Sequence, residues 1–270
     1  MNNSRDTFAP DLTVPQFLSL VVALLVATVS LAGIFWQENL YRNEALRQAF
    51  VSNDVVNLVI GLPILLGSLV LARRGKLIGL LCWPGALLYM AYNYIAYATA
   101  MPGKLQYMLY LAVVILSVIA IYLLLTMLDV AAIQQRLAGA VPERLAGGVL
   151  TGLGLLFFLW RVVHLVNVVT GKETLSKPEI GVLTADLLTI PAWVAGGVLL
   201  WRKQALGYAS GAGLLFQASM LFVGLLMFFI LQPLVAGLPF PAADFGVILV
   251  MGLVCFIPFA LYVRGVLKRS

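Results

Sequence analysis

The sequence predicts an all-α integral membrane protein with eight transmembrane helices, and its composition and hydropathy are the main evidence. Of the 270 residues, 62% are hydrophobic and only 10% are charged, and the mean hydropathy is +1.02. A soluble domain carries about 25% charged residues, so much of this chain's apolar surface has to face lipid. The apolar runs are continuous, which favours helices over the alternating pattern of transmembrane strands.

Eight segments are long enough to cross a bilayer, which takes roughly 20 mostly apolar residues per helix. They cover residues 15–36, 53–72, 76–98, 105–128, 146–169, 180–201, 206–231 and 244–263. The stretch before the first run has no cationic cluster, which suits a first span better than a cleaved signal peptide. The spans use nearly the whole chain, so a separate soluble domain is not expected.

The distribution of lysine and arginine predicts the orientation of the spans. With spans alternating in direction, eleven basic residues fall on one side, at Arg5, Arg73, Arg74, Lys76, Arg136, Arg144, Arg202, Lys203, Arg264, Lys268 and Arg269. Five fall on the other side, at Arg42, Arg47, Lys104, Lys172 and Lys177. Because cytoplasmic loops carry the excess of positive charge, we expect both termini to be cytoplasmic, in a bacterial-type plasma (inner) membrane.

The two halves of the chain resemble one another. Residues 57–74 align without gaps with residues 186–203, and both stretches have a proline near the middle and a basic end. The span that follows each stretch carries two glycines six residues apart. These matches predict a parallel repeat of four plus four helices, residues 1–135 and 136–270, within one membrane domain. Chance recurrence of glycine and leucine is the alternative.

A band of polar side chains crosses five spans in the half of the membrane away from the cytoplasm. At 1.5 Å per residue, Asp186 and Asn57 each lie roughly 24 Å from the cytoplasmic ends of their spans. The band comprises Asp54, Asn57, Tyr89, Asn93, Trp160, Arg161, His164, Asp186 and Gln217. Lipid-facing helix surface is unfavourable for such groups, so we expect them to line an intramembrane pocket that opens outward.

Arg161 and Asp186 permit two interpretations. As an ion pair they would hold two central helices together, since polar contacts between membrane helices contribute about 0.6 kcal/mol on average. As part of a ligand or proton site, Arg161 would supply positive charge and Asp186 would orient it or exchange a proton. Ionisable residues inside spans are functional candidates by default, and here several converge, which favours the second interpretation.

The catalytic candidates are His164, Asp186 and Asp54. The single histidine would act as a proton acceptor if a carboxylate lay close to it. Asp54 is also explained as the N-cap of the second span, because "SND" before an apolar run is a typical helix start. An interfacial histidine with no catalytic role is the plainer interpretation of His164.

Several classes of function are disfavoured by what the sequence lacks. The basic residues are scattered among loops without interleaved aromatics, so no nucleic-acid partner is expected. Cys82 and Cys255 form no CxxC pair, and one histidine supplies neither a bis-histidine haem site nor a zinc cluster. No lysine stands in mid-span for a retinal, and no hydrolase, P-loop or metalloprotease motif is found. We therefore expect no metal and no cofactor.

Three hypotheses follow. The first is a membrane protein that binds a small or amphipathic ligand in the polar pocket, as a transporter or a sensor, through Arg161, Asp186, Asn57, Tyr89, Asn93, Gln217 and Trp160. The second is a membrane-embedded enzyme that acts on a lipid or isoprenoid with a His–Asp pair. The third is a non-catalytic subunit of a membrane complex. The expected partners are the lipid bilayer and a small or lipid-like ligand, while partner subunits and a homo-oligomer are left open.

Overall fold

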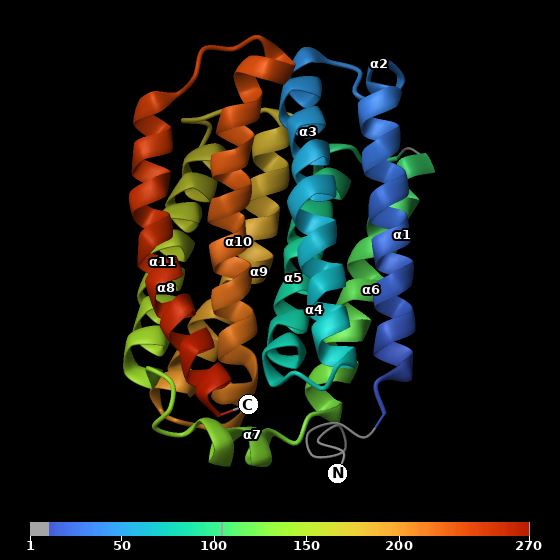
Figure 1. The fold of residues 1–270 in the computed structure, drawn as a ribbon. Coiled ribbons are helices and arrows are strands. Elements are labelled where there is room, and N and C mark those ends of the chain that lie inside the picture. Colours follow the sequence, from blue (N-terminus) through green and yellow to red (C-terminus); the bar gives the residue numbers. More distant parts are fainter. Residues whose placement is uncertain (1–10, 104, 270) are drawn as a thin grey trace.

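The computed structural model describes residues 11–103 and 105–269, and all its regular elements in these ranges are helices (Figure 1). The expected basic residues Arg5 and Lys104 lie outside the described residues. The helices are α1 (Thr13–Phe35), α2 (Gln37–Leu40), α3 (Glu44–Val56), the π-helix η1 (Asn57–Gly61), α4 (Leu62–Arg73), α5 (Leu77–Ala100), α6 (Leu105–Met127), α7 (Val130–Leu137), α8 (Glu143–Val169), α9 (Lys177–Trp201), α10 (Ala205–Ala236) and α11 (Ala242–Lys268).

Seven helical segments of the described chain are long and apolar enough to span a membrane. They are α1, the continuous α3–η1–α4, α6, α8, α9, α10 and α11. Each overlaps one of the eight segments expected from the sequence, so the multi-pass helical class is confirmed.

The remaining expected span, residues 76–98, corresponds to α5, and its assignment as an eighth span stays a prediction. This helix has 24 residues, but it is not apolar enough to be counted with the seven, because it carries Trp83, Pro84, Asn93 and four tyrosines. Nearly all its side chains are buried against α4, α6, α9 and α10. A helix enclosed by other helices is shielded from lipid, so it tolerates more polar residues than its neighbours do.

The helices before α7 and those after it lie side by side, and we call them the first and second halves (Figure 1). The chain starts α1 and ends α11 at the same end of the bundle, where the α4–α5 and α9–α10 turns and α7 also lie (Figure 1). We call this the basic end, because most of the lysines and arginines of the described chain are there, and we call the opposite end the far end.

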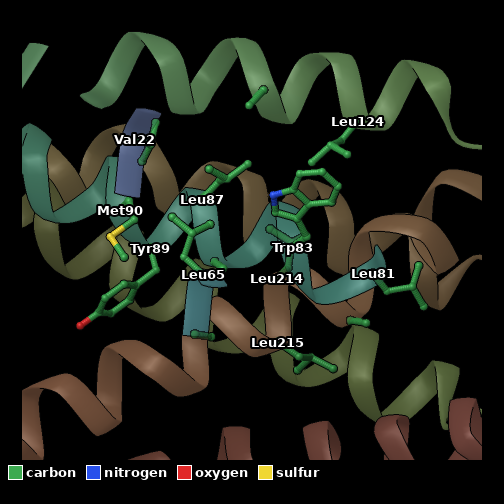
Figure 2. Packing of buried hydrophobic residues seen from close by; sticks show 14 of the residues in the cluster. Val22, Leu65, Leu81, Trp83, Leu87, Tyr89, Met90, Leu124, Leu214 and Leu215 are labelled. Atoms are coloured by element: carbon green, nitrogen blue, oxygen red, sulfur yellow. The ribbon is translucent and has the colours of Figure 1, made fainter. Parts of the chain in front are cut away.

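The two halves meet most closely where α5 crosses α10. A Cβ atom on Gly85 would lie 2.0 Å from the backbone oxygen of Gly213, and one on Gly213 would lie 2.8 Å from the oxygen of Leu81. Glycines let membrane helices approach until their backbones touch. Around this crossing Trp83, Leu87 and Leu214 contribute to the buried apolar cluster shown in Figure 2.

The turns after α4 and α9 have the same backbone geometry. Gly75 (φ 72°) and Lys203 (φ 56°) are both left-handed, and the residues on either side of them make the same return hydrogen bonds. The two turns match with a shift of 128 residues (Gly75 to Lys203), one less than the ungapped alignment of residues 57–74 with 186–203. A π-helix takes more residues per turn, and η1 precedes the turn only in the first half. Duplication itself stays a prediction.

Candidate functional site

At the far end of the first half, the carboxylate of Asp54 is fully buried between two phenols. Tyr41 donates to Oδ2 at 2.5 Å and Tyr97 donates to Oδ1 at 2.9 Å. Tyr41 lies in the loop before α3, where burial and the charge of Asp54 raise the pKa of its phenol well above the ordinary value. Tyr41 therefore keeps its proton at neutral pH and acts as the donor.

Further hydrogen bonds are made by Tyr97 and by the residues around it. The Tyr97 hydroxyl also lies 3.1 Å from the carbonyl oxygen of Phe50 and accepts from Nδ2 of Asn53 at 3.3 Å. Nearby, the hydroxyls of Ser30 on α1 and Tyr94 on α5 are 3.0 Å apart. We call Asp54, Tyr41, Tyr97, Tyr94 and Ser30 the Asp54 network.

The expectation that Asp54 is the N-cap of the second span is wrong. The helix begins at Glu44, and Asn43 is its N-cap, accepting a hydrogen bond from the backbone N–H of Leu46 at 2.8 Å. Asp54 lies inside the continuous helix, so its backbone is already satisfied and its side chain is available to the tyrosines. The polar residues of 44–53 conceal this extra helix from a search for apolar runs.

In the second half, Arg161 of α8 and Asp186 of α9 form the ion pair that the sequence analysis considered. Nε of Arg161 lies 2.5 Å from Oδ2 of Asp186, and the two side chains are 18% and 12% exposed. Tyr92 of α5 donates to Oδ1 of Asp186 at 2.9 Å, which links the pair to the first half. The guanidinium carbon of Arg161 lies 4.5 Å from the ring centre of Trp160, close enough for a cation–π contact.

The ion pair leaves most of the hydrogen-bonding capacity of Arg161 unused. A guanidinium has five N–H donors, and within the described chain Arg161 donates only through Nε. Trp160 beside it is 53% exposed, so this part of the network reaches the surface of the protein. With these N–H groups unused, Arg161 is able to donate hydrogen bonds to an additional oxygen-bearing group.

His164 lies apart from both expected carboxylates. Its Nδ1 is 3.5 Å from Oε2 of Glu173, in the loop between α8 and α9. Within the described residues no hydrogen bond or ion pair joins His164 to Asp186 or Asp54, so neither carboxylate forms a direct pair with the imidazole. The described chain also contains no group of three His, Cys, Asp or Glu residues arranged to hold a metal ion.

The remaining expected ligand-binding residues are buried inside the helix bundle. Oε1 of Gln217 accepts from the indole of Trp193 at 2.5 Å, while its Nε2 has no partner. Asn93 donates to the backbone oxygen of Tyr89 at 3.1 Å. Figure 2 shows the Tyr89 hydroxyl pointing away from the aliphatic cluster. Asn57, the first residue of η1, has no partner for either of its side-chain atoms.

The expected residues thus lie in separate places: Asp54 in its network, Arg161 and Asp186 in an ion pair, His164 beside Glu173, and Gln217 against Trp193. The residues that the sequence analysis missed are mainly Tyr41, Ser30 and Trp193. Ser30 is a small hydroxyl residue in an apolar span and Tyr41 lies in a loop, so no periodic pattern marks them. Tyr94 and Tyr97, which complete the Asp54 network, are both buried.

Helix packing differs between the two halves at the far end. In α8, α10 and α11, no described side chain is buried in residues 155–169, 225–234 and 242–251. We call these three segments the open face. Phe157 still contacts Trp193 and Phe222, with ring centres 6.5 and 6.3 Å apart. Arg161, one helical turn beyond Phe157, belongs to the α8 segment of the open face.

A cavity of about 230 Å³ lies toward the basic end of α8 and α9, lined by Thr151, Val198, Trp201 and Arg202. None of the residues expected to bind a ligand lines it. This cavity therefore does not correspond to the polar pocket expected from the sequence.

Comparison with protein-family models, with curated proteins and with solved structures gives no significant match.

Proposed function

We propose that the protein is a multi-pass membrane protein that binds an amphipathic ligand at Arg161, with the polar group of the ligand on the guanidinium and its apolar part on the open face. The observation that carries the proposal is the state of Arg161. It is paired with Asp186 through one donor only, is 18% exposed, and stands where the neighbouring helix segments bury no side chain.

The chemistry of the pair supports an anionic or carbonyl-bearing polar group. Asp186 balances the charge of Arg161 and fixes its orientation, while Tyr92 holds the second carboxylate oxygen. The free N–H groups of Arg161 then point a rigid fork of donors at the ligand, and such a fork suits carboxylate and phosphate oxygens. Trp160 offers an exposed aromatic surface beside it.

A binding role on one side of the membrane fits better than transport. If the basic end is cytoplasmic, Arg161 lies in the outer half of the bilayer. At the basic end, Glu143 accepts from Tyr208 at 3.0 Å and from the backbone of Gly139 at 2.7 Å, and Tyr262 donates to the backbone of Tyr208. These hydrogen bonds tie α8, α10 and α11 together there, and we therefore favour a sensor or receptor over a transporter.

The experiment uses the purified full-length chain in detergent with phosphatidylglycerol as an anionic amphipath and phosphatidylcholine as its zwitterionic counterpart. We expect phosphatidylglycerol to raise the thermal unfolding midpoint and to change the fluorescence of Trp160. In the double variant Arg161→Gln/Asp186→Asn, which removes both charges and leaves no unpaired ion, both effects should be lost. Lys172→Gln, in the α8–α9 loop at the same end, is the matched control and should respond like the wild type.

Each alternative has its own outcome. An equal response of the wild type and the double variant would contradict binding at Arg161 and favour the structural-subunit hypothesis. Turnover on a lipid panel that is lost in His164→Ala while folding is retained would favour the enzyme hypothesis. The structure gives the enzyme hypothesis less support, because His164 faces Glu173 rather than Asp54 or Asp186.

A further inference from the structure

The proposed ligand site makes no use of Asp54, which is the most completely enclosed carboxyl group of the described chain. Its side chain has 0% exposure and receives two phenol hydroxyls, yet no lysine, arginine or histidine of residues 11–103 and 105–269 forms an ion pair with it. An isolated negative charge is strongly disfavoured in a medium of low dielectric constant, and phenol hydrogen bonds do not cancel its charge. The site therefore lacks a positive charge.

The surroundings of Asp54 supply oxygen atoms but no cationic side chain. The titratable groups that face it are the phenols of Tyr41, Tyr94, Tyr97 and Tyr110, which come from the α2–α3 loop, α5 and α6. From α1 it meets Ser30 and the backbone at Gly33, where an added Cβ atom would lie 1.9 Å from Oδ2. No charged side chain of α9 or α10, which also pack on α3, acts on Asp54 within the described chain.

A second observation comes from Asn57, one helical turn from Asp54. Its side chain is completely buried and lies next to Tyr94, but neither its oxygen nor its nitrogen makes a hydrogen bond of good geometry. Buried amides are nearly always satisfied, and an exception calls for a missing partner such as an ion or a water molecule. Asn57 is also the first residue of η1, and single π-helical turns occur frequently at functional sites.

We propose that the Asp54 network, together with Asn57, binds one monovalent cation, either a proton on the carboxyl group or a sodium ion beside it. The shared chemistry is the neutralisation of Asp54 by a single positive charge. Oxygen atoms from Asp54, Asn57 and Ser30 are the hard ligands that a small cation prefers.

The hydrogen-bond pattern accommodates the proton directly. The Tyr97 hydroxyl has one hydrogen and two acceptors within reach, Phe50 O and Asp54 Oδ1. When Tyr97 donates to Phe50, its oxygen is free to accept a proton held on Oδ1, in addition to the bond from Asn53. A protonated Asp54 therefore has hydrogen-bond partners without any movement of the heavy atoms of the network. A sodium ion, in contrast, has to be coordinated by the unpaired side-chain oxygen of Asn57.

The test measures thermal unfolding of the full-length protein in detergent as a function of sodium and of pH. Sodium chloride is compared with potassium chloride and choline chloride at equal ionic strength. If the cation is sodium, the unfolding midpoint of the wild type should rise by about 2–4 °C in sodium only. If it is a proton, the midpoint should be indifferent to sodium and fall as pH rises, because the folded state then loses a bound proton.

Asp54→Asn, which supplies a neutral group of the same shape, should abolish whichever dependence the wild type shows. Asp244→Asn, at an exposed position in α11, makes the same chemical change and should retain it. The proposal is wrong if the wild type shows neither dependence, or if Asp54→Asn responds as the wild type does.

A second measurement covers the case in which Asp54→Asn does not fold. The infrared spectrum of the wild type should contain the carbonyl band of a buried protonated carboxylic acid, or lose it on addition of sodium. Tyr97→Phe keeps the ring packing but removes one partner of Oδ1, so it should shift that band. Absence of the band in the wild type, together with no sodium effect, overturns the proposal independently of any variant.

Discussion

The aspartates at the far ends of the two halves, Asp54 and Asp186, differ in the charge of their partners and in how completely they are enclosed. In the first half, Asp54 is sealed by α1, the α2–α3 loop and α5, and its partners are neutral hydroxyls. In the second half, Asp186 has a cationic partner, and that partner belongs to one of three helix segments without buried side chains. One phenol bond is common to both, from Tyr97 and from Tyr92.

This difference determines which of the two sites a molecule from outside the protein is able to contact. A large ligand has access to Arg161 but not to Asp54, because only the second is enclosed by packed side chains. Conversely, only a proton or a small ion fits the Asp54 network without unfolding it. In the two proposals, burial therefore separates the sites by the size of what each would bind, although both belong to the same band of polar residues in the sequence.

The largest effect is expected from filling the space beside Asp54. Gly33→Val should fail to fold or lose well over 1–3 kcal/mol of stability, roughly the range for overpacking, because its Cβ atom would lie 1.9 Å from Oδ2 of Asp54. Gly246→Val in the open face meets nothing within 4 Å and should be close to neutral. Thermal unfolding and the yield of monodisperse protein compare the two, and equal losses would contradict the distinction between closed and open regions.

A smaller loss is expected from unpairing Asp186. Removing one partner of a fully buried ion pair costs about 3–5 kcal/mol, and partial exposure should reduce the cost for Arg161→Gln to about 2–3 kcal/mol. Adding Asp186→Asn should restore part of the stability, as a double-mutant cycle would measure. Arg47→Gln breaks the exposed Glu44–Arg47 pair and serves as the control near zero. No recovery in the double variant would mean that the charges do not interact.

The smallest effects are expected from single phenol hydroxyls. Tyr41→Phe should cost about 1–2 kcal/mol, because the Asp54 oxygen left behind has no access to water. Tyr92→Phe should cost about 0.5–1 kcal/mol, since Asp186 keeps Arg161 as a partner. Chemical or thermal unfolding of the two variants side by side measures the difference. A larger loss of stability in Tyr92→Phe than in Tyr41→Phe would contradict the inference that Asp54 depends more on its phenol partners than Asp186 does.

The sequence predicts the spans better than it predicts the sites. Apolar runs are set by contact with lipid, so each overlaps a helix of the structure, including the less apolar run that became α5. The start of α3 does not follow from apolar runs, because Glu44, Arg47 and Gln48 make its first turns polar on the exposed side. The Arg161–Asp186 contact was foreseen from charge and depth alone. The partners of Asp54 were not, because Ser30 and Tyr41 come together only through tertiary packing.

The contact between Gly85 and Gly213 has a mechanical consequence. It lies about 12 Å from the start of α5 and roughly 22 Å from its other terminus, at 1.5 Å per residue. The halves also meet by their backbones nearer the far end, where a Cβ atom on Gly181 of α9 would lie 2.4 Å from the backbone oxygen of Ala96 on α5. Two such contacts, about 16 Å apart along α5, oppose a rotation of one half about either of them. Tyr92 lies on the stretch of α5 between them, so its hydroxyl is held in place against Asp186 of the second half.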